Sequence, residues 1–130
     1  MLGVVHWTTM GGVSLASFVT VVETPEFIKR AHELMTDQER EAVISYLARH
    51  PTAGVLVLGA GGIRKLRWGL EGHGKRGGAR VIYFYASPHV PLFALTVFAK
   101  NERAELSQGD RNTFRRLTKL LVETYRRRTR

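Results

Sequence analysis

The stretch Ile63-Arg64-Lys65-Leu66-Arg67-Trp68 alternates cationic with apolar residues, and the apolar run Arg80-Val81-Ile82-Tyr83-Phe84-Tyr85 follows it. Alternation with a period of two is typical of a strand, because successive side chains of a strand point to opposite faces. Lys65 and Arg67 should therefore share one face, and Leu66 and Trp68 the other. A row of cations on an otherwise apolar sheet predicts a surface that meets an anion, most simply a phosphate backbone.

The remaining elements are predicted from caps, turns and propensities. Residues 17–23 are rich in β-branched side chains and predict a first strand. Thr24-Pro25 is typical of a helix start, and Thr36-Asp37-Gln38-Glu39 has the spacing of a capping box, so two helices should form a hairpin over residues 24–49. Strands are expected at residues 55–58, 63–70, 79–86 and 92–99, and a last helix at residues 107–125, capped by Ser107.

This order of elements, β-α-α-β-β-β-α, predicts an α+β fold in which helices cover one face of a mainly antiparallel sheet. The length of 130 residues suits one domain. Residues 1–22 carry no Asp, Glu, Lys or Arg and include Gly11-Gly12, so residues 1–16 are expected to be an accessory or disordered extension. The domain itself is expected to span residues 17–130.

The charge of the chain is strongly positive and uneven. Its 20 Lys and Arg against 11 Asp and Glu give a net charge of +9, which favours a nucleic acid or an acidic protein as partner. Residues 60–103 hold most of the presumed strands and carry only two acids, Glu71 and Glu102. The chain has no cysteine, no apolar run long enough to cross a membrane and no basic start of a secretory signal, so a cytoplasmic protein without membrane contact is expected.

The cations of the strands are the candidate site residues. Arg80 opens one strand and Lys100 closes the next, so both should converge with Arg64, Lys65 and Arg67 near one end of the sheet and grip phosphates. An ordinary solvated strand face is the alternative. Beside Lys100, Asn101 is a candidate for orienting a ribose or phosphate, and Glu102 is expected to pair with Arg64 or Arg80 and hold the cluster in shape.

Other chemistry is weakly indicated. The loop Gly72-His73-Gly74-Lys75-Arg76-Gly77-Gly78 lacks the pattern of a phosphate-binding loop, and its Lys75 and Arg76 are expected to touch RNA. The five histidines have no metal-ligand spacing, so no metal and no cofactor are expected. Without a dominant histidine, a Lys or Tyr whose pKa is lowered by neighbouring cations is the possible base.

Taken together, three segments resemble the RelE/ParE toxin superfamily, and most closely its HigB-like branch. They are Gly62-Ile63-Arg64-Lys65-Leu66-Arg67-Trp68, Gly78-Ala79-Arg80-Val81-Ile82-Tyr83-Phe84-Tyr85 and Leu95-Thr96-Val97-Phe98-Ala99-Lys100-Asn101-Glu102. The resemblance covers residues 17–125 and implies a small RelE-like fold. It also implies a type II toxin that enters the ribosomal A site and cleaves mRNA there without a metal ion. Its implied partners are the ribosome, mRNA and a cognate antitoxin with a helix-turn-helix domain.

In that chemistry the ribose 2′-hydroxyl attacks the adjacent phosphate. The catalytic cations of the family match Lys65, Arg67, Arg80 and Lys100, with Arg64 and Asn101 as additions. Arg80 would stabilise the pentacoordinate phosphate, Lys65 and Arg67 would position or deprotonate, and Lys100 would protonate the leaving oxygen. The C-terminal tyrosine that some members use has no clear match here, where Leu106-Ser107 stand nearby. A ParE-like toxin that binds DNA gyrase and a non-catalytic nucleic-acid-binding domain are the alternatives.

Overall fold

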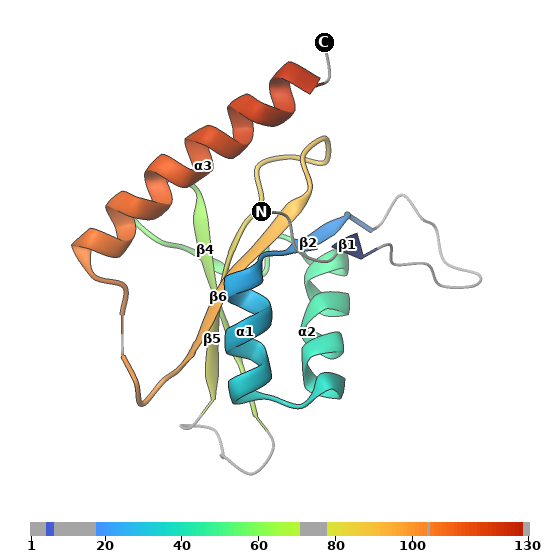
Figure 1. The fold of residues 1–130 in the computed structure, drawn as a ribbon, viewed down its shortest axis with the longest axis vertical. Helices are drawn as coiled ribbons and strands as arrows, with labels where there is room; N and C mark the ends of the chain where they lie inside the picture. Colours follow the sequence, from blue (N-terminus) through green and yellow to red (C-terminus); the bar gives the residue numbers. More distant parts are fainter. Residues whose placement is uncertain (1–4, 7–17, 71–77, 104, 129–130) are drawn as a thin grey trace.

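The computed structural model describes residues 5–6, 18–70, 78–103 and 105–128 of the chain. It has the α+β architecture expected from the sequence, including the two-helix hairpin and the C-terminal helix (Figure 1). The elements in chain order are β1 (Val5–His6), β2 (Val21–Glu23), α1 (Pro25–Leu34), α2 (Asp37–Arg49), β3 (Val55–Leu56), β4 (Ile63–Trp68), β5 (Ala79–Phe84), β6 (Leu92–Ala99) and α3 (Gln108–Arg128).

The strands form one sheet in the order β1-β2-β6-β5-β4-β3. Only β2 and β6 run parallel among the strands described, so the sheet is mainly antiparallel as predicted. The first predicted strand is shorter than expected, since β2 starts at Val21. Of the predicted extension over residues 1–16, only residues 5–6 are described, and they pair with Val21 and Val22.

The helical hairpin begins and turns where the capping signals predicted. The Thr24 side chain accepts a hydrogen bond from the Phe27 N–H at the start of α1, and Thr36 and Glu39 form a complete capping box at the start of α2. Apolar side chains of both helices pack on one face of the sheet. They include Phe27, Ala31, Val43 and Leu47, which join Val81, Tyr83 and Val97 in one buried cluster.

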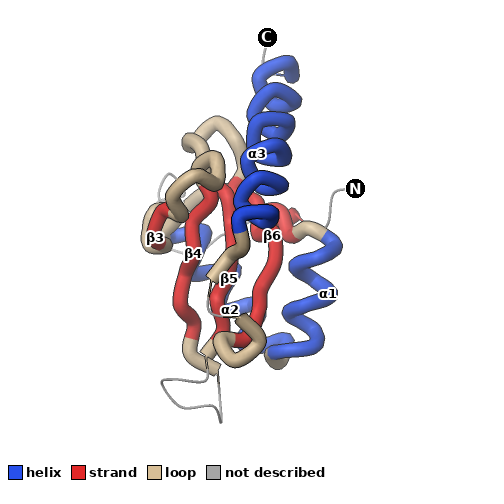
Figure 2. Tube along the Cα trace, turned by 90° about the vertical axis from the view of Figure 1, so that its left-hand side faces the viewer, coloured by secondary structure: helices blue, strands red, loops and turns tan. Residues whose placement is uncertain are grey.

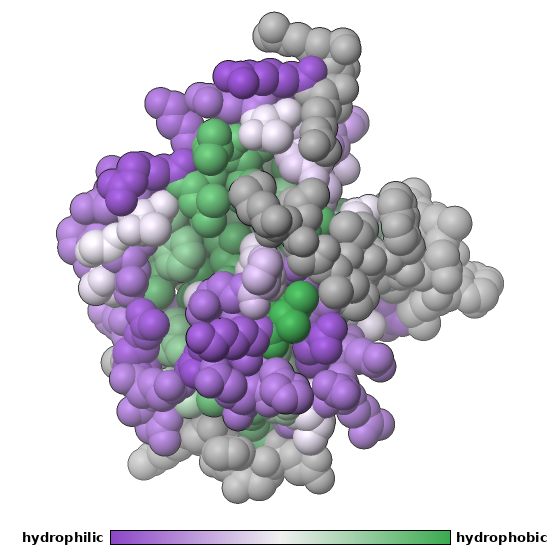
Figure 3. Space-filling view, in the orientation of Figure 1, coloured by the Kyte–Doolittle hydropathy of each residue, from purple (hydrophilic) through white to green (hydrophobic). Residues whose placement is uncertain are grey.

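Helix α3 packs on the opposite face, so the expectation that the helices share one face is wrong for α3. Its apolar stripe of Phe114, Leu117, Leu121 and Tyr125 packs with Ile63, Ile82, Phe84 and Phe93. On β5, Ile82 and Phe84 of this cluster alternate with Val81 and Tyr83 of the other cluster. Figure 1 shows the strands between α3 on the left and the α1–α2 hairpin on the right, and Figure 3 shows apolar side chains gathered between α3 and the strands.

The turn before β4 fixes where α3 crosses the sheet. Gly61 has a φ of +72°, and a Cβ built on it would lie 2.5 Å from Thr118 Oγ1 and 2.9 Å from Arg115 Cα. The backbone of the turn therefore touches the middle of α3, an approach that a side chain at position 61 would prevent. In Figure 2, which faces the α3 side, α3 crosses the upper part of the sheet and no described helix crosses the lower ends of β4 and β5.

No helix in the part of the chain that the structure describes combines the length and the apolar character that crossing a membrane requires.

Candidate functional site

Three of the predicted cations lie together on the α3 side of the sheet. Arg67 of β4 stands directly opposite Arg80 of β5, and Lys65 stands opposite Ile82, whose side chain belongs to the cluster under α3. This arrangement confirms that Lys65 and Arg67 share a face, with Leu66 and Trp68 on the other. Directly opposed like charges destabilise a sheet, so their pairing is unfavourable unless an anion lies between them.

Arg80 is the most buried of these cations, with 8% of its surface exposed. Its Nη1 donates a hydrogen bond to the backbone oxygen of Ala79 at 3.2 Å. Within the described residues no carboxylate pairs with it. Burial lowers the pKa of the Arg80 guanidinium, and the positive charge of Arg67 lowers this pKa further. The free protein therefore holds a guanidinium that a bound phosphate would stabilise.

Lys100 continues the hydrogen-bonded pairing of β5 and β6 past the end of β6. Its N–H donates to the backbone oxygen of Gly78 at 3.0 Å, one step beyond the pairing of Phe98 with Arg80. Alternation along the ladder places the Lys100 side chain on the face of Phe98 and Arg80. Lys65, Arg67, Arg80 and Lys100 thus form one surface, which we call the cationic face. The adjacent Asn101 is exposed in the turn that follows.

Glu102 does not pair with Arg64 or Arg80, so that expectation is wrong. Its Oε1 accepts hydrogen bonds from the Ala99 N–H, at 2.8 Å, and from Arg30 of α1. The hydrogen bond from Ala99 lowers the pKa of the Glu102 carboxyl, and the charge of Arg30 contributes in the same direction. Glu102 holds the β6 turn against α1 instead of neutralising the cationic face.

Arg103 is a fifth cation beside this face that the sequence reasoning did not assign to the site. Its guanidinium carbon lies 4.9 Å from the centre of the Phe98 ring, and Phe98 is the register partner of Arg80. An ion pair of 2.8 Å joins Arg103 to Asp110, whose carboxylate also accepts from the Ser107 N–H at the start of α3. The cap of α3 therefore anchors Arg103, an arrangement that depends on tertiary packing.

Arg64, the first cation of the alternating stretch, lies on the opposite face of β4. It stands opposite Tyr83, and its Nη1 donates to the backbone oxygens of Thr52 and Gly54 at 3.1 and 2.7 Å. Arg64 thus fastens the turn before β3 and is not part of the cationic face. The predicted RNA contacts Lys75 and Arg76 lie outside the described residues.

Tyr83 lies under that same turn and is not suited to be a base. Its hydroxyl donates to the backbone oxygen of Pro51 and accepts from the Gly54 N–H, each at 2.8 Å. Burial raises the pKa of Tyr83, in the direction opposite to that required of a tyrosine base. Its role is to hold the edge of the sheet in place.

A hollow of about 180 Å³ opens beside Lys65, between β3 and the start of α3. Glu105, Leu106 and Arg111 line it together with Lys65, and residues 55–58 complete the wall. The Nε of Arg111 is buried and has no hydrogen-bond partner among the described residues. Neither Glu105 nor Arg111 was predicted to belong to the site, because the loop and the helix that carry them reach Lys65 only in the folded chain.

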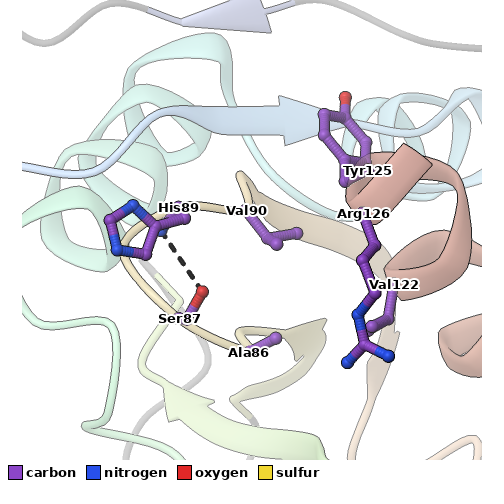
Figure 4. A pocket seen from close by; sticks show the side chains of 7 residues that line it. All are labelled: Ala86, Ser87, His89, Val90, Val122, Tyr125 and Arg126. Carbon is purple, nitrogen blue, oxygen red and sulfur yellow. Dashed lines mark hydrogen bonds between the residues drawn. The ribbon is translucent and has the colours of Figure 1, made fainter. Parts of the chain in front are cut away.

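A second pocket, of about 330 Å³, lies between the β5–β6 turn and the last turns of α3 (Figure 4). Ala86, Ser87, His89, Val90, Val122, Tyr125 and Arg126 line it, and the His89 N–H donates to Ser87 Oγ at 3.2 Å. None of the cationic face residues lines this pocket. Within the described ranges, no group of three or more His, Asp or Glu side chains is placed to hold a metal ion.

The cationic face can bind a polyanion and stabilise charge that develops on a phosphate. Comparison with known families matches residues 22–128 to the one described as RelE toxin of the RelE/RelB toxin–antitoxin system. The matched region contains every residue of the cationic face and of the hollow beside Lys65.

Proposed function

This chain belongs to the RelE toxin family of toxin–antitoxin systems, and from that premise we propose that it is a ribosome-dependent endoribonuclease. In this proposal the protein cleaves mRNA in the ribosomal A site and so inhibits translation in the cytoplasm. The ribose 2′-hydroxyl attacks the adjacent phosphate, which leaves a cyclic phosphate and a free 5′-hydroxyl. Since the nucleophile belongs to the substrate, the proposed reaction needs no metal ion.

The buried guanidinium of Arg80 is the observation that carries this proposal. It lies near the start of β5, between β4 and β6 and opposite Arg67, and no carboxylate of the described residues neutralises it. A structural arginine in such a position is normally paired. Charge that develops on a pentacoordinate phosphate would find two guanidinium groups here, and positive groups placed at developing charge stabilise a transition state.

The other cations of the face have proposed roles that follow from their positions. Lys65 and Arg67 lie along β4 and position the RNA backbone, and Lys100 protonates the leaving 5′-oxygen. Asn101, exposed beside Lys100, orients a ribose or phosphate. Lys75 and Arg76, which belong to the sequence between β4 and β5 and lie outside the described residues, remain proposed RNA contacts.

The proposed protein partner is a cognate antitoxin, with a helix-turn-helix domain, that covers the cationic face. The alternative hypothesis is a ParE-like toxin, which binds DNA gyrase and does not cleave RNA. The face favours RNA cleavage over that alternative, because ParE-type members tend to lack the full set of cations. A domain that only binds nucleic acid would explain the charge but not the burial of Arg80.

Primer extension on cellular mRNA after induction of the protein distinguishes these hypotheses. The proposal expects codon-phased cuts in the wild type, no cuts with Arg80→Glu, and wild-type cuts with the control Arg116→Glu on the exposed side of α3. Growth arrest by Arg80→Glu, or inhibited supercoiling by purified gyrase without any mRNA cuts, would contradict it. RNA binding that weakens with salt, without any mRNA cleavage, would support the non-catalytic nucleic-acid-binding domain instead.

A further inference from the structure

We propose that Glu105 is the general base of this reaction, accepting the proton of the attacking 2′-hydroxyl in the hollow beside Lys65. This inference rests on the proposed ribonuclease activity. It assigns to a carboxylate, outside the cationic face, the proton-accepting role for which the sequence offered Lys65 and Arg67 as candidates.

The hollow is the extension of the cationic face toward the sheet edge. Lys65 belongs to both, since it lies on the face with Arg67 and also lines the hollow with Glu105 and Arg111. A phosphate held by Arg67 and Arg80 would thus have its neighbouring ribose near Glu105. The exposed side chains of Val55, Leu56 and Leu58 offer an apolar wall for the nucleobase attached to that ribose.

Glu105 is available for proton transfer, whereas the neighbouring carboxylates are not. Glu102 is tied to Arg30 and to the backbone of Ala99, and Asp110 to Arg103 and the backbone of Ser107. No hydrogen bond or ion pair of Glu105 exists among the described residues, and its side chain is exposed where it lines the hollow. A base has to be within hydrogen-bond reach of its proton and must not be engaged elsewhere.

Arg111 adds a second cation to the lining of the hollow. Its Nε is buried without a hydrogen-bond partner in the described chain, which is costly for a charged group. With Lys65, Arg111 places two positive charges along the hollow, where an RNA strand would pass. Arg111 is therefore an RNA-positioning residue in the proposed complex.

The proposed step balances without any further reactant. The O2′–H proton moves to a carboxylate oxygen of Glu105 as the O2′ electron pair forms a bond to phosphorus. The bond from phosphorus to O5′ then breaks, and the departing O5′ takes a proton from the Lys100 ammonium. One proton is accepted and one is given, and solvent restores both groups afterwards.

Other residues with suitable chemistry lie elsewhere. His89 lines the pocket at the other end of α3, and His50 stacks on Tyr46 at the end of α2, on the opposite side of the sheet. Tyr83 is buried on that opposite side as well. Among the described residues, Glu105 is the carboxylate that lines a hollow with one of the proposed site cations.

The test is single-turnover cleavage of mRNA on purified ribosomes by the wild type, Glu105→Gln, Glu105→Asp and the control Glu123→Gln, whose carboxylate is exposed further along α3. Glu105→Gln should slow cleavage by roughly 10²- to 10⁴-fold with unchanged ribosome affinity. Glu105→Asp should recover part of the rate, and Glu123→Gln should match the wild type. The same variants are then measured on an mRNA whose scissile O5′ is replaced by sulfur, a leaving group that needs no protonation.

Each outcome decides one point. A Glu105→Gln defect that persists on the sulfur substrate supports a base, because proton removal from O2′ is still needed. A rate within threefold of the wild type, a defect confined to ribosome affinity, or a defect that disappears on the sulfur substrate overturns the assignment. If the wild type itself cuts no ribosome-bound mRNA, the proposed function fails, and the assignment with it.

Discussion

Replacing Arg80 by methionine should make the protein more stable while removing its activity. Arg80 and Arg67 are direct cross-strand partners, so their charged groups lie on the order of 6 Å apart. With an effective dielectric constant between about 40 and 80, two unit charges at that distance repel by roughly 0.7–1.4 kcal/mol. Burial of Arg80, at 8% exposure, adds to this cost, and methionine fills a similar volume without charge.

The expected gain is about 1 kcal/mol in the free energy of unfolding, or about 3–5 °C in Tm for a domain of this size. Thermal unfolding followed by circular dichroism at low salt measures it. Because salt screens the repulsion between the two cations, the gain should shrink in 0.5 M NaCl. Sulfate should stabilise the wild type more than Arg80→Met, since it occupies the space between the arginines.

Arg116→Met is the matched control, because Arg116 is exposed on α3. It should change stability by no more than about 0.5 kcal/mol. If Arg80→Met lowered the free energy of unfolding by more than about 1 kcal/mol at low salt, Arg80 would be a structural residue. The argument that its charge is held for a substrate would then be refuted.

Three further predictions concern the elements that hold the site. Tyr83→Phe should lower the free energy of unfolding in urea by about 2–4 kcal/mol, because a buried N–H of Gly54 and a partly buried oxygen of Pro51 lose their partner; a cost below 0.5 kcal/mol would contradict the geometry. Glu102→Gln should lower Tm at neutral pH, since the folded-state pKa of Glu102 is depressed by the Ala99 N–H and by Arg30. That contribution is present above the unfolded-state pKa and is lost as the pH falls through the folded-state value, so the two proteins should converge in acid, and a Tm difference that persists there would exclude this cause. Gly61→Ala should raise hydrogen exchange in α3, because position 61 has a positive φ and touches that helix; unchanged protection would show that α3 does not depend on this contact.

The sequence predicted most of the elements because their signals are local. The caps at Thr24 and Thr36 and the alternation over Ile63–Trp68 depend only on neighbouring residues, and the structure confirms all three. The position of α3 was not predictable in the same way. Residues 80, 82 and 84 and residues 81, 83 and 85 are both largely apolar sets, so the pattern of β5 does not say that each face carries a helix.

The residues of the candidate site also differ in whether local sequence signals or tertiary packing determine their positions. Alternation was sufficient to group Lys65, Arg67 and Arg80, because their face follows from strand period alone. Partners distant in sequence were missed: Glu102 pairs with Arg30, 72 residues away, instead of with a cation of the face. Arg103, Glu105 and Arg111 were missed as well, because their places depend on how α3 packs across the sheet. The sequence places Glu105 two residues before Ser107, the cap of the predicted helix, but does not show whether its carboxylate has a partner in the folded chain.

The proposed reaction depends on the 2′-hydroxyl of ribosome-bound mRNA as the nucleophile that breaks the chain. The most direct test is cleavage, on purified ribosomes, of an mRNA with a single 2′-deoxy nucleotide immediately before the A-site phosphate that is cut in the all-RNA control. We expect the control to yield a cyclic phosphate and a 5′-hydroxyl, the deoxy message to stay intact, and neither to be cut without ribosomes. Cleavage of the deoxy message at the same phosphate would contradict it.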